Sequence, residues 1–480
     1  MRTLFTFLLT LVILNSSCSR QQIHQLEADV CIIGAGSAGI GAALAASRSG
    51  ADVILVEKEE KVGGTSVQSY VNTWEPGPGC SYANEIYHRL PPGAKGVAKQ
   101  VHSYDRDEPY GLSLVSPQLS YNLSLRRSDL DVKTETANVV FDVNEFDHTV
   151  RQMLEETGRC KLLLNTKFVN ANVTNNEIKT IEAISSSGQK YQVSAKVFID
   201  CTGGAFVCRN AGCETMLGEE PRSKFGEPSA PENPSNSLNA ISLCYQIKPL
   251  KTPSVSDTLK KPEPDYDVVA HVTGPVGPDQ KLTVNPLGII DGKSIIDQPP
   301  DELYEKAKNL VDKHWSKLHT YPHFKEYEFD SYAPMLGIRE SYRIVCRYVL
   351  TQNDLLSGLP KQKHEDIITV ADHPMDLHGE NSSLKLLKEA YGVPYRSLVP
   401  KGFDNLLVAG RGAGFSHIAA SSCRLSRTMM SLGHAAGFAA WLSASEERAV
   451  WDVPVKRVQE EMNLKLRPKK DLNADPLPIK

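Results

Sequence analysis

The chain has 480 residues, of which 41% are hydrophobic, and this length suffices for two or three globular domains. Its formal net charge of −4 comes from mixed charges without a long basic run, which argues against nucleic acid as a partner. The spacing of its ten cysteines matches neither a zinc site nor an iron–sulfur cluster, so we expect no metal.

The first 18 residues have the pattern of a secretory signal. An apolar run over residues 4–14 follows Arg2, and these eleven residues are too few to span a bilayer. Small residues before Cys18 predict lipoprotein processing, with the lipid on Cys18 and residues 19–27 as a tether. Plain signal cleavage is the alternative, because Asn15 is unusual at such a site. We therefore expect an exported protein, periplasmic or at the cell surface, anchored to a bacterial membrane through Cys18.

Residues 29–66 predict a dinucleotide-binding unit. A short apolar strand over residues 29–33 ends in GAGSAG, a small-residue helix follows, and a second apolar strand over residues 53–56 stops at Glu57. Gly34 permits the tight turn, Gly36 lets the backbone approach a pyrophosphate, and Gly39 lets helix and strand pack closely. The helix N-terminus adds free N–H groups and the positive end of a dipole. Glu57 lies 57 − 34 = 23 residues after Gly34, where a carboxylate can bind an adenosine ribose.

The second glycine pair favours a flavin over a nicotinamide dinucleotide. Gly63-Gly64-Thr65 suits a loop that covers a flavin diphosphate, although an ordinary surface turn would also have this sequence. No second GxGxxG motif is present for NAD(P)H. Residues 80–131 are rich in Gly, Pro, Tyr and Ser, and we interpret them as irregular.

Regular structure is predicted again from residue 138. We expect a helix over residues 144–157, then strands over 161–165, 167–173, 180–185, 191–193 and 196–201, the last ending in Thr202-Gly203-Gly204. Residues 205–401 have looser patterning, with predicted helices over 300–319 and 341–356, and we interpret them as a substrate or cap domain.

The chain then returns to the first domain. An apolar strand over residues 404–409 ends in Gly410-Arg411-Gly412, and Ser421 and Ser422 predict the start of a long helix that runs to about residue 443. Gly433 and Gly437 in its interior each cost about 1 kcal/mol relative to Ala, which indicates a close approach by another helix or by a cofactor. The start of this helix could face the pyrimidine end of a flavin, whereas an ordinary C-terminal helix would need no cofactor.

Taken as a whole, the chain resembles bacterial FAD-dependent oxidoreductases and, more distantly, fumarate reductases and other flavin dehydrogenases. The motifs that carry this resemblance are IIGAGSAGIGAALAAS, VGGTS, VFIDCTGGA, GIRESYRIV, HPMDLHG, YGVPYRSLVPKGFDNLLVAGRGAG and SLGHAAGFAA. Family members more often have ATGDGD where this chain has CTGGA from Cys201, so the acid of that motif is missing here.

The resemblance implies an α/β fold, in which a Rossmann-like FAD-binding domain of the glutathione-reductase type carries an inserted substrate or cap domain. We expect the FAD-binding domain at residues 28–204 and 402–445, the cap at 205–401, and a terminal helix and tail at 446–480. The residues that we expect to contact FAD are Gly34, Gly36, Ser37, Ala38, Gly39, Glu57, Lys58, Gly63, Gly64, Thr65, Thr202, Gly203, Gly410, Arg411, Ser422 and Cys423.

Five further residues are candidates for the chemistry. Arg339 and Arg396 could clamp a carboxylate or polarise a carbonyl, although a structural ion pair would explain either of them equally well. His373, His378 or His417 could accept an alcohol proton while a hydride passes to the flavin N5, the alternative for each being a structural role. We expect His417, just before the predicted long helix, to lie nearest the flavin ring.

Together these features predict an FAD-dependent oxidoreductase that transfers a hydride between the flavin and a small polar substrate. A sugar, a polyol, or a hydroxy or keto acid would suit such a site, and the electron acceptor stays open. The alternative is a flavin-containing lipoprotein that binds a ligand without turnover, for which no base is needed.

Overall fold

The computed structural model describes residues 23–74, 81–99, 114–116, 137–251, 270–379 and 382–462. The predicted signal peptide and Cys18 lie outside these residues. Within the described ranges, no helix is both long and apolar enough to cross a bilayer.

A central sheet forms the core of the molecule, with strand order β7-β2-β1-β10-β9-β8. Four neighbouring parallel segments are largely buried on both faces, namely the second half of β1 (Ile23–Ile33), β2 (Val53–Val56), the second half of β10 (Lys190–Asp200) and β21 (Leu406–Val408), which pairs with β10. Burial on both faces explains why these strands are continuous apolar runs. The register pairs Ile33 with both Val56 and Asp200, so the turns after these strands meet at one edge of the sheet. The predicted α/β fold is therefore confirmed.

The sheet is extended on one side by β7 (Cys160–Leu163), and on the other by the antiparallel strands β9 (Glu177–Ser185) and β8 (Thr166–Thr174). The predicted strands at 191–193 and 196–201 are one continuous strand, β10, because its first half pairs with β1 and β9 and its second half with β1 and β21. The predicted helix over residues 144–157 is confirmed as α4 (Val143–Glu156), and the Asp142 side chain caps its N-terminus.

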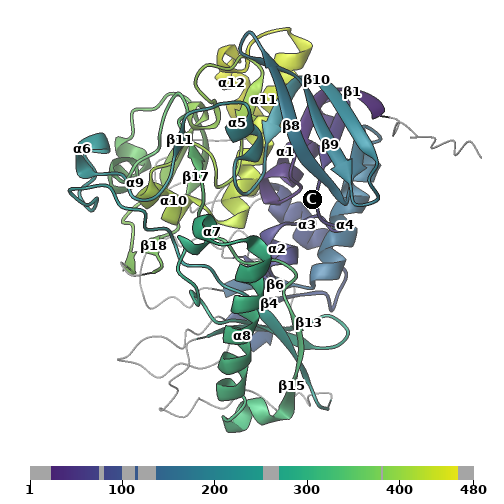
Figure 1. Cartoon of the computed structure of the whole chain (residues 1–480), viewed down its shortest axis with the longest axis vertical. Helices are drawn as coiled ribbons and strands as arrows, with labels where there is room; N and C mark the ends of the chain where they lie inside the picture. The colour runs from purple at the N-terminus through teal and green to yellow at the C-terminus, as the bar shows by residue number, and fades with distance from the viewer. Residues whose placement is uncertain are drawn as a thin grey trace, which may run out of the picture.

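Two helices cover one face of the sheet and cross at very short range, α1 (Ser37–Arg48) and α11 (Ser426–Ser445) (Figure 1). A Cβ atom on Gly433 would lie 1.9 Å from the Ala38 carbonyl oxygen, and one on Gly437 would lie 2.1 Å from the Ala42 carbonyl oxygen. The glycines that were expected to permit a close approach therefore permit that of another helix.

The start of this helix differs from the prediction. The segment is broken into α10 (His417–Cys423) and α11, and the cap of α10 is the Ser416 side chain, which accepts a hydrogen bond from the Ala419 N–H. Ser421 and Ser422 are buried inside α10 instead of capping a helix. The chain ends its described part in α12 (Val455–Glu461).

The middle of the chain builds a second, antiparallel sheet with order β13-β14-β12-β15. Its strands are β12 (Tyr245–Pro249), β13 (His271–Val276), β14 (Lys281–Asn285) and β15 (Tyr327–Tyr332). Helix α8 (Pro300–Leu318) buries Leu303, Ala307 and Val311 in the same hydrophobic cluster as these strands, which confirms the helix predicted from residue 300. In Figure 1, α8 and β15 lie at the opposite end of the molecule from α11 and α12.

Two other predictions about secondary structure are wrong. Residues 341–356 are mostly extended, with β16 (Arg343–Ile344) and a short α9 (Gln352–Ser357), because the N–H groups of Ile344 and Leu350 bond to the carbonyls of Gly412 and Gly414 in a distant loop. Residues 80–131 were expected to be irregular, but the described part of this stretch, 81–99 and 114–116, contains α3 (Ser81–Arg89), β4 (Lys95–Lys99) and β5 (Leu114–Ser116). The rest of the stretch lies outside the described residues. Strands β4 and β5 join β3 (Thr73–Trp74) and β6 (Ala137–Phe141) in a third sheet. The predicted domain boundaries stay predictions.

Candidate active site

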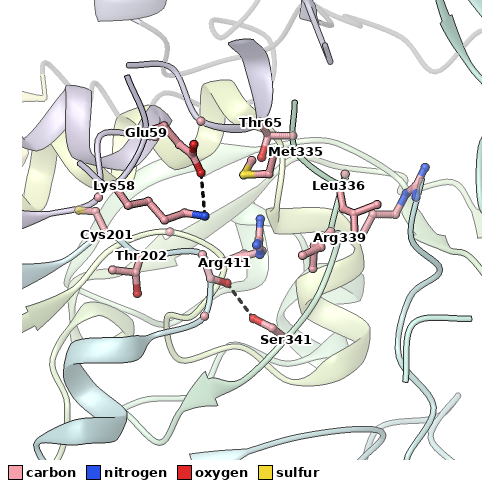
Figure 2. Close-up of a pocket in the computed structure, with 18 of the residues that line it drawn as sticks. Lys58, Glu59, Thr65, Cys201, Thr202, Met335, Leu336, Arg339, Ser341 and Arg411 are labelled. Carbon is pink, nitrogen blue, oxygen red and sulfur yellow. Dashed lines mark hydrogen bonds and ion pairs between the residues drawn. The ribbon is translucent and has the colours of Figure 1, made fainter. Parts of the chain in front are cut away.

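A cavity of about 1860 Å³ opens at the edge where the parallel strands of the central sheet end. The turns after β1, β2, β10 and β21 form one wall, and cap residues around α8 and residues 334–342 form the other. Ligand pockets usually measure about 300–1,000 Å³. The cavity is therefore large enough for a dinucleotide and a second ligand together (Figure 2).

The turn between β1 and α1 has the shape that a pyrophosphate needs. Gly34 has φ +97°, and a Cβ there would lie 2.7 Å from the Cys201 carbonyl oxygen. Gly36 is the N-cap residue of α1 and makes no side-chain cap, so the first N–H groups of α1 are not capped by its own side chain. Gly36, Ser37 and Ala38 line the cavity, whereas Gly39 packs against the Gly34 carbonyl behind it.

Glu57, at the end of β2, fastens this turn. One carboxylate oxygen accepts the Ala35 N–H at 2.6 Å and the other accepts the Glu59 N–H at 3.0 Å. Burial raises the pKa of this carboxyl group, against the lowering by the two hydrogen bonds. Glu57 and Lys58 both line the cavity, and Lys58 is ion-paired with Glu59 at 2.8 Å (Figure 2).

The glycine pair Gly63-Gly64 contacts the glycine turn between β1 and α1. Gly64 has φ +49°, and a Cβ there would lie 2.8 Å from the Gly36 Cα. The Gly63 N–H donates to the Ala35 carbonyl at 2.8 Å. Gly64 and Thr65 line the cavity and Gly63 supports them from behind, so this loop closes over the glycine turn.

An arginine lies where the turns after β10 and β21 meet. A Cβ on Gly203 would be 2.3 Å from the Arg411 Nη2, so the guanidinium lies against the Gly203 backbone (Figure 2). In the part of the chain that the structure describes, no acidic side chain pairs with Arg411, and its buried Nε has no hydrogen-bond partner. Burial and then the charge of Arg424 lower the pKa of Arg411 to about 10. An unpaired cation beside a glycine turn fits a diphosphate, and Thr202, Gly203 and Gly410 line the same wall.

Sequence reasoning missed the acid that shapes this wall. Asp200 is fully buried at the end of β10, where its carboxylate accepts hydrogen bonds from the Thr202 N–H and hydroxyl and from the Cys208 N–H. Asp200 thus fixes the start of the CTGGA turn from behind, without lining the cavity itself. An acid ending an apolar strand was the available signal, as it was at Glu57.

Three of the five candidate catalytic residues, Arg339, His373 and His378, line the cavity. Asp376 lies in β18 (Met375–Leu377) and His378 directly follows this strand. The His378 Nε2 lies 2.7 Å from an Asp376 carboxylate oxygen. Arg424 Nη2 lies 3.2 Å from the same oxygen. The His373 Nδ1 lies 2.8 Å from the Pro374 carbonyl oxygen. Asp376, which was not among the candidates, therefore joins His378 to Arg424.

The other two candidates lie elsewhere. Arg396 is half-exposed, pairs with Asp366 at 2.9 Å and stacks on Tyr348, outside the cavity lining. It is therefore the structural ion pair that was its alternative interpretation.

His417 is also absent from the cavity lining, because α10 turns it into a buried cluster of carboxylates. Its ring Nδ1 lies 2.9 Å from a carboxylate oxygen of Glu340, and its ring Nε2 lies 3.5 Å from one of Glu219. Its backbone N–H donates to the Glu220 carboxylate at 2.9 Å. Burial lowers the pKa of His417, but the charge and hydrogen bond of Glu340 outweigh it and raise the pKa overall. The structure thus corrects the expected position of His417 nearest the flavin and indicates a structural role.

Ser422 and Cys423 need the same correction. Both are fully buried in α10 and do not line the cavity. The Ser422 hydroxyl donates to the His373 carbonyl at 2.5 Å and bonds the Tyr391 hydroxyl. The residues of this segment that reach the cavity are Arg424, Leu425, Ser426, Arg427 and Met429.

The chain was compared with known proteins. A segment of 57 residues, 12% of this chain and 10% of the relative, is 42% identical to a 4-oxocyclohex-2-ene-1-carboxylate 5-dehydrogenase of Sinomonas cyclohexanicum, so the match spans a small part of either protein. A geranylgeranyl bacteriochlorophyll reductase-like structure from Thermoplasma acidophilum is 14% identical with a TM-score of 0.48, covering 94% of this chain and 88% of the other. The structure of a flavoprotein/dehydrogenase from Cytophaga hutchinsonii is 14% identical with a TM-score of 0.48, covering 90% of this chain and 83% of the other.

The family assignment rests on a match over almost the whole described chain. Residues 29–462 match the model of the family described as FAD dependent oxidoreductase. The glycine turns, Glu57 and the unpaired Arg411 are a donor set suited to such a dinucleotide, so the residues present fit FAD. The protein is thus an enzyme of the FAD dependent oxidoreductase family, and its cofactor is FAD.

Proposed function

We propose that this enzyme oxidises or reduces a small polar substrate, a sugar, a polyol or a hydroxy or keto acid, with His378 as the group that moves the proton. The observation that carries the proposal is the Asp376–His378 pair on the cavity wall. FAD, when bound, supplies the capacity to take up or release two electrons as a hydride. The residues from Gly34 to Ala38, with Glu57, Gly64 and Arg411, would hold it.

The hydrogen bonds set the protonation of His378. With Asp376 accepting from Nε2–H, the neutral ring has Nδ1 as its proton-accepting atom, and Nδ1 has no hydrogen-bond partner among the described residues. Burial, together with the charges of Arg339 and Arg424, lowers the pKa of His378 by more than Asp376 raises it, so the ring is neutral near pH 7. A neutral imidazole oriented by a carboxylate is the arrangement that a general base requires.

Arg424 keeps the orienting carboxylate ionised. Burial alone would raise the pKa of Asp376, but the hydrogen bond from His378 and the charge of Arg424 hold it well below its usual range. Asp376 therefore stays an acceptor throughout the physiological pH range, and the tautomer of His378 is fixed.

His373 is the second candidate for the proton. Its Nδ1 lies against the Pro374 carbonyl, an acceptor, so Nδ1 carries the hydrogen and Nε2 is the basic atom.

The experiment compares wild-type enzyme with His378→Ala, and with His148→Ala as the control, because His148 is an exposed histidine of α4 outside the cavity lining. FAD-loaded protein is mixed anaerobically with D-glucose, D-sorbitol and L-lactate, and the visible flavin absorbance is followed. We expect at least one compound to bleach the wild type and the control, and His378→Ala to bleach far more slowly. A spectral shift without bleaching by any compound would favour the binding lipoprotein instead.

The proposed location is outside the cytoplasm, with a lipid on Cys18. The apolar run over residues 4–14 and the small residues before Cys18 support it. Cys18→Ala should move the protein from the membrane fraction to the soluble periplasm or the medium. Unchanged membrane association of this variant would contradict anchoring through Cys18.

A further inference from the structure

An arginine of the cap, Arg339, lines the cavity. Arg339 is held by neutral groups, since its Nη1 donates to the Ala240 carbonyl and to the Ser242 hydroxyl, both at 2.7 Å. Among the described residues, no carboxylate lies within ion-pair distance of Arg339. Asp376 is the acid nearest to it in electrostatic effect, and this carboxylate already bonds His378 and Arg424.

Arg339 has no counter-charge of its own among the described residues, because Asp376 already bonds Arg424 and His378. Burial and then the charge of Arg424 lower the pKa of Arg339 to about 10, which still leaves it cationic near pH 7. Burying a charge without a counter-charge is costly, so this arrangement is one that an anion stabilises.

The free edge of Arg339 has a specific shape. Both of its recorded hydrogen bonds use Nη1, so Nε and Nη2 donate to no residue in the described ranges. These two N–H groups form the parallel fork that binds both oxygens of a carboxylate. A single hydroxyl would satisfy only one of them, and a neutral sugar would bring no counter-charge.

This charge is separate from the one that serves FAD. Arg411 lies against Gly203 at the end of the central sheet, whereas Arg339 is anchored on Ala240 and Ser242 of the cap. FAD therefore accounts for Arg411 and leaves Arg339 without an anion.

We propose that the substrate is a carboxylate, a hydroxy or keto acid or a sugar acid, whose carboxylate is bound by the Nε and Nη2 edge of Arg339 with Arg424 contributing charge. The inference rests on the proposed function and narrows its substrate class. Arg339 and His378 line the same cavity, and the charge of Arg339 reaches the imidazole of His378. A hydroxyl group near the carboxylate carbon would then meet the proton acceptor.

The experiment measures binding of matched pairs of compounds to the FAD-loaded full chain by titration calorimetry. The pairs are glycolate with ethylene glycol and D-glucuronate with D-glucose, which differ by the carboxylate. We expect each acid to bind at least tenfold more tightly than its neutral partner. Arg339→Gln should weaken binding of the acids about 10- to 150-fold, since a hydrogen bond to a charged group contributes about 1.5–3 kcal/mol. Arg339→Lys should recover part of that loss.

The control is Arg159→Gln, which removes an exposed arginine paired with Asp52 outside the cavity and should leave acid binding unchanged. Equal affinity for acids and neutral partners in wild-type protein would overturn the inference, and so would full acid binding by Arg339→Gln. If Arg339→Gln fails to fold, Arg424→Gln and the wild-type pairs decide it. Acid binding without flavin reduction by any compound would sustain the inference and contradict the proposed function. Reduction of the flavin by glucose or sorbitol, without tighter binding of the acids, would support the proposed function and contradict the inference about the carboxylate.

Discussion

Replacing Gly433 by Ala should destabilise the protein, although helix propensity alone predicts the opposite. The added Cβ would lie 1.9 Å from the Ala38 carbonyl oxygen, and ordinary contact begins at 3.4 Å, so the helices must separate by up to 3.4 − 1.9 = 1.5 Å. Overpacking of this kind costs about 1–3 kcal/mol, and the clash is with backbone, which cannot rotate away. The gain in helix propensity is about 1 kcal/mol. We therefore expect a net loss of up to about 2 kcal/mol.

Urea unfolding followed by circular dichroism measures this loss, with Ser445→Ala, an exposed position at the end of the same helix, as the control. Because Ser37 and Ala38 at the start of α1 line the cavity, Gly433→Ala should also retain less FAD after dialysis. Gly437→Ala should behave alike. The double variant should lose less stability than the two single variants together, because one separation of the helices relieves both clashes. A Gly433→Ala protein that is more stable than wild type would refute the reasoning.

Three further predictions concern the site. His378→Ala should slow flavin reduction about 10²- to 10⁴-fold per bound flavin in stopped-flow measurements, and the wild-type rate should rise with pH to a plateau near or below pH 6.5, because the pKa of His378 is lowered. His417→Ala should cost about 3–5 kcal/mol of stability with little change in that rate, because it leaves Glu340 buried without its histidine. The pKa of His417 is raised, so its contribution is complete below pH 6.5 and is lost as pH rises through the raised value; urea unfolding at pH 6 and pH 9 should show a smaller gap between wild type and variant at pH 9. Gly36→Val should give folded protein without yellow colour, and a variant that keeps its flavin absorbance would count against the glycine turn as the pyrophosphate site.

The sequence was most informative where local pattern and tertiary role coincide. The strand, glycine turn and helix after residue 29 could be predicted because each residue type there has a local cause, such as the positive φ of Gly34. The role of Gly433 and Gly437 could be predicted equally well, because the helix propensity that a glycine loses implies a neighbour at short range.

Side-chain direction was less predictable than position. His417 follows a glycine turn, as a residue near a cofactor would, but it lies in the first turn of α10 and faces carboxylates from residues 219, 220 and 340. None of these distant partners can be read from the sequence around His417. Asp376 was accessible by contrast, since alternate residues of an extended segment share one face and His378 lies two positions later.

The position of β21 in the central sheet has a consequence for how the enzyme is made. This strand and α11 complete the wall around the first glycine turn, yet they follow the end of β10 by more than 200 residues. At about 5–20 residues per second, a ribosome needs about 12–49 s to travel the 445 − 200 = 245 residues from the end of β10 to the end of α11. Throughout that interval the nascent first half has an open sheet edge at β10 and an uncovered α1. Tight capture of FAD must therefore wait until the last tenth of the chain is being synthesised, and a polypeptide truncated before residue 400 should emerge without cofactor.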